Sequence, residues 1–89
     1  MAMPKYRTLT YLKNIGDKLS SRLNEVGIYS EDELREIGAV NAHEMIQNRY
    51  PEEKLPICYY LYSFDGAISN IHWNDIDSRR KKALKKAIE

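Results

Sequence analysis

Several features that define large classes of protein are missing from this sequence of 89 residues. Its single cysteine, Cys58, cannot form an internal disulfide, and no apolar run approaches the roughly 20 residues that a membrane-spanning helix needs. The start of the chain does not resemble a signal peptide, because Pro4, Lys5 and Arg7 are not followed by an apolar run. These absences predict a protein of the reducing cytoplasm that has no contact with a membrane.

The residue patterns of common catalytic and metal sites are also absent. The sequence contains no glycine-rich phosphate loop, no serine nucleophile elbow and no arrangement of paired carboxylates that stands out. His43-Glu44 resembles the start of a zinc-protease motif, but Gln47 stands where the second histidine would be. Cys58 and His72 lack metal-ligand spacing, and Cys58 is expected to be a small buried apolar residue. We therefore predict no enzymatic activity, no cofactor and no bound metal.

A large net charge is missing too. Lys and Arg total 14 while Asp and Glu total 13, so the formal net charge of +1 gives no general attraction to nucleic acid or membrane. The distribution is less even, because residues 1–53 carry 7 basic and 9 acidic side chains whereas residues 54–89 carry 7 and 4. Most of the positive excess lies in the last predicted helix.

No stretch of the sequence alternates apolar and polar residues as a strand does, and the boundaries are typical of helices. We therefore predict an all-α fold, a compact bundle of five to six short helices in a single domain that spans residues 1–89. Residues 1–7 are expected to be a loosely ordered lead-in. One helical turn capped by Thr8 then carries Leu9 and Leu12 to the core.

The stretch from Leu12 to Leu34 organises the rest of the chain: it predicts a turn, a helix, a second turn and the start of another helix, a pattern that resembles a helix-hairpin-helix unit. The turn at residues 14–16 contains Asn and Gly, which tolerate left-handed backbone conformations, and apolar residues at helical spacing follow it. Gly27 is expected to end this helix and Ile28 to return to the core. Ser30 and Glu33 have the spacing of a capping box, which opens the next helix.

The remaining helices follow from caps and from apolar spacing. The most apolar predicted helix has more than one apolar face, so we expect it to lie at the centre; its apolar residues are Cys58, Leu61, Tyr62, Ala67, Ile68 and Ile71. A glycine inside that helix, Gly66, indicates that another backbone passes close by. The predicted spans are 31–37, ended by Gly38; 41–49, capped by Asn41 and ended by Pro51; 55–69, with Pro56 in the first turn; and a last helix capped by Asp77, with Ala83, Leu84, Ala87 and Ile88 on its buried face.

Residues along nearly the whole chain, from about Tyr6 to Leu84, resemble the C-terminal domain of the TfoX (Sxy) family, known as regulators of natural competence in bacteria. The resemblance implies a small all-helical bundle related to helix-hairpin-helix and SAM-like domains. The competence regulators carry a separate N-terminal domain, for which this chain has no space before its Met1, so the resemblance implies family membership more directly than competence control. It is carried by Leu12, Asn14-Ile15-Gly16, Leu23, Gly27-Ile28, Glu33-Leu34, Gly38-Ala39, Leu61-Tyr62, Asp65-Gly66-Ala67-Ile68 and His72-Trp73.

The predicted hairpin is the first candidate for binding an anion. Backbone N–H groups at a helix N-terminus can bind a DNA phosphate, and the candidate residues are Lys13, Asn14, Gly16 and Lys18. Asp17 would repel a phosphate there and complement the helix dipole by itself. A structural role for the hairpin is therefore favoured over phosphate binding.

The last helix is the better electrostatic candidate, since it places six cations within eight residues. They could follow a phosphate backbone, lie against an anionic surface or meet an acidic protein. A solvated terminal helix whose cations complement its own dipole explains them equally well. These candidate residues are Arg79, Arg80, Lys81, Lys82, Lys85 and Lys86.

Two hypotheses for function follow. The first is a non-catalytic module for protein or nucleic-acid recognition, linked to transcription or competence. The alternative is a structural domain that self-associates, as in a homodimer, or docks on a protein without contacting nucleic acid. Tyr59, Tyr60 and Tyr62 could stack on bases, but packing in the core and at its rim is the favoured role for tyrosines of an apolar helix.

Overall fold

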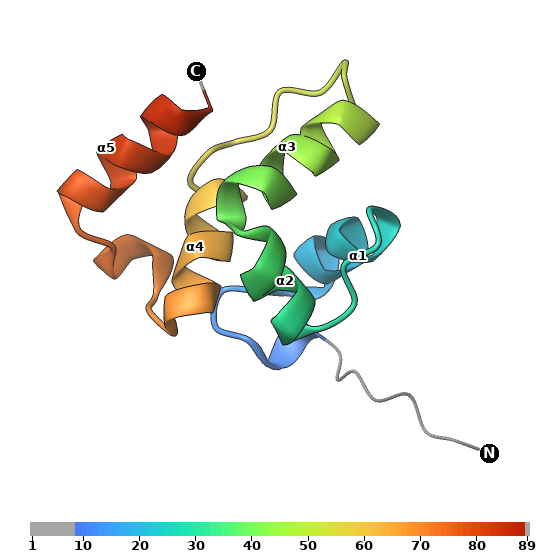
Figure 1. The fold of residues 1–89 in the computed structure, drawn as a ribbon, viewed down its shortest axis with the longest axis horizontal. Helices are drawn as coiled ribbons and strands as arrows, with labels where there is room; N and C mark the ends of the chain where they lie inside the picture. The colour runs from blue at the N-terminus through green and yellow to red at the C-terminus, as the bar shows by residue number, and fades with distance from the viewer. Residues whose placement is uncertain (1–8, 89) are drawn as a thin grey trace.

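A computed structural model describes residues 9–88, and within this range every regular element is helical (Figure 1). The predicted all-α bundle is confirmed. The expected loose ordering of residues 1–7 and the cap at Thr8 lie outside the described residues. The elements in chain order are the 3₁₀-helix η1 (Leu9–Tyr11), α1 (Asp17–Glu25), α2 (Glu31–Ile37), α3 (Ala39–Arg49), α4 (Leu61–Ser69), the 3₁₀-helix η2 (Trp73–Asp75) and α5 (Ser78–Ala87).

Helix α4 lies at the centre of the bundle, as predicted. It packs most extensively on α3 and also contacts α2, η2 and α5 (Figure 1). Burial of each large apolar side chain contributes roughly 1.5–3 kcal/mol, and α4 supplies Leu61, Phe64 and Ala67 to the core while the surrounding elements supply the rest. The side chains fully shielded from solvent come from several elements and include Leu19, Leu23, Ile28, Leu34, Ile46, Leu61 and Phe64.

Local signals determine the connection between α1 and α2. Gly27 takes a positive φ of 87° after α1, and the Ile28 backbone N–H donates to the Leu23 carbonyl at 2.9 Å. This pattern is a Schellman motif, and it returns Ile28 to the core as predicted. At the start of α2, Ser30 Oγ accepts from the backbone N–H of Glu33 at 3.2 Å, which confirms the predicted cap.

The predicted start of α3 at Asn41 is wrong. Helix α3 begins at Ala39. Gly38, with a φ of 86°, is the C-cap residue of α2 and also the N-cap residue of α3. Asn41 lies inside α3, where its Nδ2 donates to the Ile37 carbonyl at 3.0 Å. The Asn41 amide therefore supplies a hydrogen bond to a carbonyl at the end of α2 and does not cap α3.

The predicted start of the central helix at Leu55 is also wrong, because α4 begins at Leu61. Leu55 is buried but belongs to the irregular segment between α3 and α4. The chain turns once before the helix starts, and the Tyr60 backbone N–H donates to the Pro56 carbonyl at 3.0 Å. Cys58 in this turn is exposed, so the expectation that it is buried is wrong as well.

Helix α5 packs on α4 along a narrow edge. Asp77 accepts from the Arg79 backbone N–H at 3.1 Å and caps the helix, as predicted. Leu84 is buried and Ile88 is half-buried. The alanines predicted on the same face, Ala83 and Ala87, are exposed, because α5 meets the bundle along one side only.

Candidate nucleic-acid interface

The turn before α1 is the first predicted contact region. Asn14 has a left-handed backbone with a φ of 74°, Ile15 is buried, and Gly16 is the N-cap residue of α1. No side chain accepts a hydrogen bond at this cap. The positive end of the α1 dipole therefore has no side-chain acceptor, and Lys13 and Lys18 are exposed on either side of it in the sequence.

The Asn14 side chain serves the interior of the fold. Its Nδ2 donates to the Ile71 carbonyl at 2.8 Å and to the Ser63 carbonyl at 3.4 Å. Its Oδ1 accepts from the Trp73 backbone N–H at 3.0 Å. The amide therefore ties the hairpin to α4 and η2, and its donor and acceptor atoms are occupied within the protein.

The hairpin presents charges of both signs. Asp17 is the exposed first residue of α1, where its carboxylate complements the helix dipole and opposes a phosphate. The ammonium of Lys18 lies 5.9 Å from the ring centroid of Tyr59, whose side chain is exposed. This arrangement favours the structural role of the hairpin over phosphate binding.

Arg80 is the cation by which α5 is held to α4. Its guanidinium binds the Asp65 carboxylate through two bonds, Nη2 to Oδ1 at 2.7 Å and Nε to Oδ2 at 3.2 Å. Asp65 is buried, whereas the Arg80 side chain remains partly exposed. The hydrogen bond to the carboxylate raises the pKa of Arg80 above its usual value, so the guanidinium stays charged at neutral pH.

Lys81 also faces inward. Its Nζ lies 5.6 Å from the ring centroid of Tyr62 and 5.9 Å from that of Trp73. Such cation–π contacts stabilise by roughly 0.5–1 kcal/mol at partly exposed sites. Arg80 and Lys81 therefore connect α5 to the rest of the fold, and their charges are already partnered.

The other four cations of α5 point away from the bundle. Each helical residue is rotated by about 100° from the last, so Arg79, Lys82 and Lys86 fall within a stripe roughly 60° wide, directly opposite the buried Leu84. Lys85 extends the stripe on one side and is exposed as well. Among residues 9–88, no ion pair includes any of these four cations, and no acidic residue lies within α5.

The hairpin and the first turn of α5 are joined through η2. Trp73 provides the link, since its backbone binds Asn14 and its ring lies near Lys81. From there α5 runs away from the hairpin along the edge of the bundle (Figure 1). The structure thus brings Lys81 near the hairpin and leaves Lys85 and Lys86 at the far end of the same helix.

The tyrosines before and in α4 have different environments. Tyr60 is buried and packs edge-on against Phe64, with ring centroids 6.2 Å apart, and Tyr62 is half-buried. Tyr59 has a 44% exposed side chain and contacts the edge of Tyr60. Packing in the core and at its rim, the role favoured from the sequence, accounts for Tyr60 and Tyr62.

Sequence reasoning missed Asp65 as the residue that holds Arg80. An acidic residue in a strongly apolar helix is the available signal, because a buried carboxylate needs a cation or several hydrogen bonds. In the described part of the chain, no group of three or more His, Cys, Asp or Glu residues is placed to hold a metal ion. None of the described helices has the length and apolar character of a membrane span.

Comparison with known proteins points to one family. The profile of the TfoX C-terminal domain matches residues 5–88. An uncharacterized protein of Listeria monocytogenes, in a triclinic crystal form, is 31% identical and superposes with a TM-score of 0.81 over 91% of this chain and 89% of its own. A protein of unknown function from the same organism, in a tetragonal form, is 32% identical with a TM-score of 0.79 over 89% and 93% of the two chains. The search of curated proteins gives no match.

Proposed function

Because this chain belongs to the TfoX C-terminal domain family, we propose that it is a non-catalytic binding module that recognises duplex DNA through the outer face of α5. The family suggests a setting in the regulation of transcription or of natural competence, in the cytoplasm. The residues proposed to contact phosphates are Arg79, Lys82, Lys85 and Lys86.

The observation that carries the proposal is the division of the α5 cations into two sets. Arg80 and Lys81 contact groups within the fold, and these contacts fix the orientation of α5. The outward cations have no carboxylate among the ion pairs of residues 9–88, and they share one face. A row of cations on one helix face, none of them in an ion pair among residues 9–88, matches the regular negative charge of a phosphate backbone better than a scattered set would.

Salt dependence tests the proposal directly. The triple variant Arg79→Gln, Lys82→Gln, Lys86→Gln should bind duplex DNA more weakly, and the slope of log affinity against log salt should fall by roughly 2 to 3, because each phosphate contact contributes about 0.9 to that slope. The charge-conserving variant Arg79→Lys, Lys82→Arg, Lys86→Arg is the matched control and should keep the slope. Fluorescence anisotropy at several salt concentrations measures both.

A folded protein that fails to bind DNA at low salt would contradict the proposal. An equal loss of binding in the charge-conserving control would also contradict it, because the binding would then depend on the shape of these side chains and not on their attraction to phosphate charge. The result would favour the alternative hypothesis, a module that docks on a protein or on a second copy of itself.

A further inference from the structure

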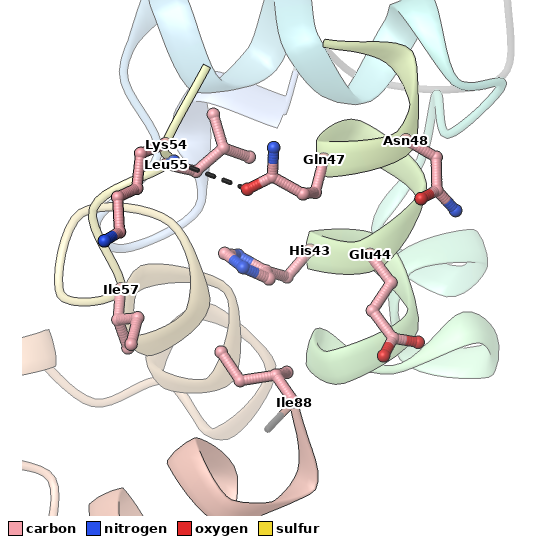
Figure 2. A pocket seen from close by; sticks show the side chains of 8 residues that line it. All are labelled: His43, Glu44, Gln47, Asn48, Lys54, Leu55, Ile57 and Ile88. Carbon is pink, nitrogen blue, oxygen red and sulfur yellow. Dashed lines mark hydrogen bonds between the residues drawn. The ribbon is translucent and has the colours of Figure 1, made fainter. Parts of the chain in front are cut away.

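A pocket of about 520 Å³ lies on the side of the bundle where α3, the segment 51–60 and the end of α5 meet (Figure 2). Pockets that bind small ligands usually measure roughly 300–1,000 Å³, with apolar walls and a few polar groups that fix orientation. This pocket combines both kinds of surface, and none of the outward cations proposed to bind DNA is among its lining residues.

One wall of the pocket is built by Gln47. Its Oε1 accepts from the Leu55 backbone N–H at 3.4 Å, and its Nε2 donates to the Tyr50 carbonyl at 3.0 Å and to that of Glu53 (Figure 2). These bonds hold the irregular segment against α3. The pocket is therefore formed in advance, and a ligand does not have to order the loop.

His43 provides a polar group with no partner. Its side chain projects from α3 into the pocket, and the residue is only 5% exposed (Figure 2). Nδ1 is shielded from solvent and has no hydrogen-bond partner among residues 9–88. Burial lowers the pKa of His43 below its usual value, so the ring is neutral at pH 7. An unpaired buried acceptor costs less than an unpaired buried donor, so the neutral ring carries its proton on Nε2 and leaves Nδ1 as the acceptor.

The two charged groups around His43 lie on different sides of the pocket (Figure 2). Lys54 lies across the pocket from α3, while Glu44 is on the α3 side (Figure 2). Ile57 and Ile88 form the half-buried apolar part of the lining. A ligand that satisfies these groups needs one negative end near Lys54 and a hydrocarbon portion.

We propose that this pocket binds a small amphipathic monocarboxylate. The carboxylate accepts hydrogen bonds from Lys54 Nζ and from His43 Nε2–H, and the hydrocarbon packs between Ile57 and Ile88. Glu44 repels a second negative charge, so monocarboxylates bind more tightly than dicarboxylates of the same length.

NMR titration of the full chain with hexanoate tests the proposal. We expect saturable amide shifts at the pocket residues with a millimolar dissociation constant, weaker binding of hexanol, and weaker binding of adipate. Lys54→Gln should weaken hexanoate binding about fivefold, the loss expected for one hydrogen bond of ordinary strength at an exposed side chain. Lys13→Gln, an exposed cation outside the pocket lining, is the matched control and should leave the affinity unchanged.

Glu44→Gln tests the selectivity, because it should raise the affinity for adipate more than the affinity for hexanoate. Equal affinities of hexanoate and hexanol, an unchanged affinity in Lys54→Gln, or no saturable shift at the pocket would each overturn the proposal. The DNA-binding triple variant of α5 should bind hexanoate normally, so the two proposals succeed or fail separately.

Discussion

Gly66 lies where α4 is crossed by two other parts of the chain. A Cβ atom there would fall on the Ile71 carbonyl oxygen and would stand 2.5 Å from Nδ2 of Asn14. The prediction from the sequence that another backbone passes close to Gly66 is therefore confirmed. Only a residue without a side chain permits the hairpin and the end of α4 to meet at this point.

Substitution Gly66→Ala should destabilise the fold by about 1–3 kcal/mol, because the added methyl group forces backbone atoms apart. Gly16→Ala is the matched control. It has nothing within 4 Å of its Cβ position, and it should lose only about 0.5 kcal/mol because alanine is less favourable than glycine at the N-cap of α1. Urea unfolding of both variants measures the difference, and equal midpoints would contradict the predicted clash.

Asn14 shows what sequence reasoning at a single residue can and cannot reach. Its positive φ could be predicted, because Asn beside Gly is a common signal for a left-handed turn. Its three hydrogen bonds could not, since their partners lie 49 to 59 residues away in the chain. The same limit applies to Arg80, whose charge is visible in the sequence and whose partner Asp65 is fixed only by the packing of two helices.

At the scale of elements, α5 is attached to α4 by both apolar and ionic contacts. Leu84 supplies the buried apolar side chain, and the Asp65–Arg80 pair supplies the ionic contact. A buried carboxylate is costly without its cation, so the pair fixes where α5 docks.

Arg80→Gln should lower the free energy of unfolding by about 1–3 kcal/mol, because it leaves the buried Asp65 carboxylate without its charged partner. The neighbouring Arg79→Gln is the matched control. It removes an exposed charge that pairs with no carboxylate among residues 9–88 and should change stability by less than about 0.5 kcal/mol. Thermal unfolding would separate them, and similar effects would show that the Asp65 pair does not hold α5.

Helix ends that are set by neighbouring residues are predicted correctly, whereas an end that is set by a contact distant in the sequence is not. Helix α2 has the predicted bounds, because Ser30 and Gly38 cap it with bonds a few residues long. The start of α4 is different, since Leu55 and the residues after it are apolar enough for a helix. Gln47 in α3 binds the Leu55 backbone N–H, and that distant contact holds the segment outside the helix.

At the scale of the whole molecule, His43 makes stability depend on pH. It is buried, and desolvation lowers its pKa below the ordinary value of 6.5, against a smaller opposing effect of Glu44. Above pH 6.5 the ring is neutral in the folded and unfolded states alike. As the pH falls below 6.5 the unfolded chain takes up the proton more readily, so stability decreases toward the folded-state pKa.

The free energy of unfolding should therefore fall between pH 7.5 and pH 5.5, by about 1.4 kcal/mol at most for each unit of pKa difference. His43→Gln should reduce this fall, although the variant starts from a different stability. His72→Gln, which replaces the other, exposed histidine, should keep it. Urea titrations at the two pH values measure the free energy of unfolding of each variant. If it falls as much with pH in His43→Gln as in the original protein, the pH dependence belongs to other groups.

A ribosome releases Asn14 well before it releases residues 63–73, to which that side chain binds. At roughly 5–20 residues per second, the 59 residues between Asn14 and Trp73 take about 3 to 12 seconds to synthesise. Throughout that interval the hairpin lacks the partners of Asn14, and α2 and α3 lack the central helix α4 on which they pack. The domain therefore completes its fold only after residues 63–73 have been made, and a product that ends before them keeps its apolar faces open to chaperones and proteases.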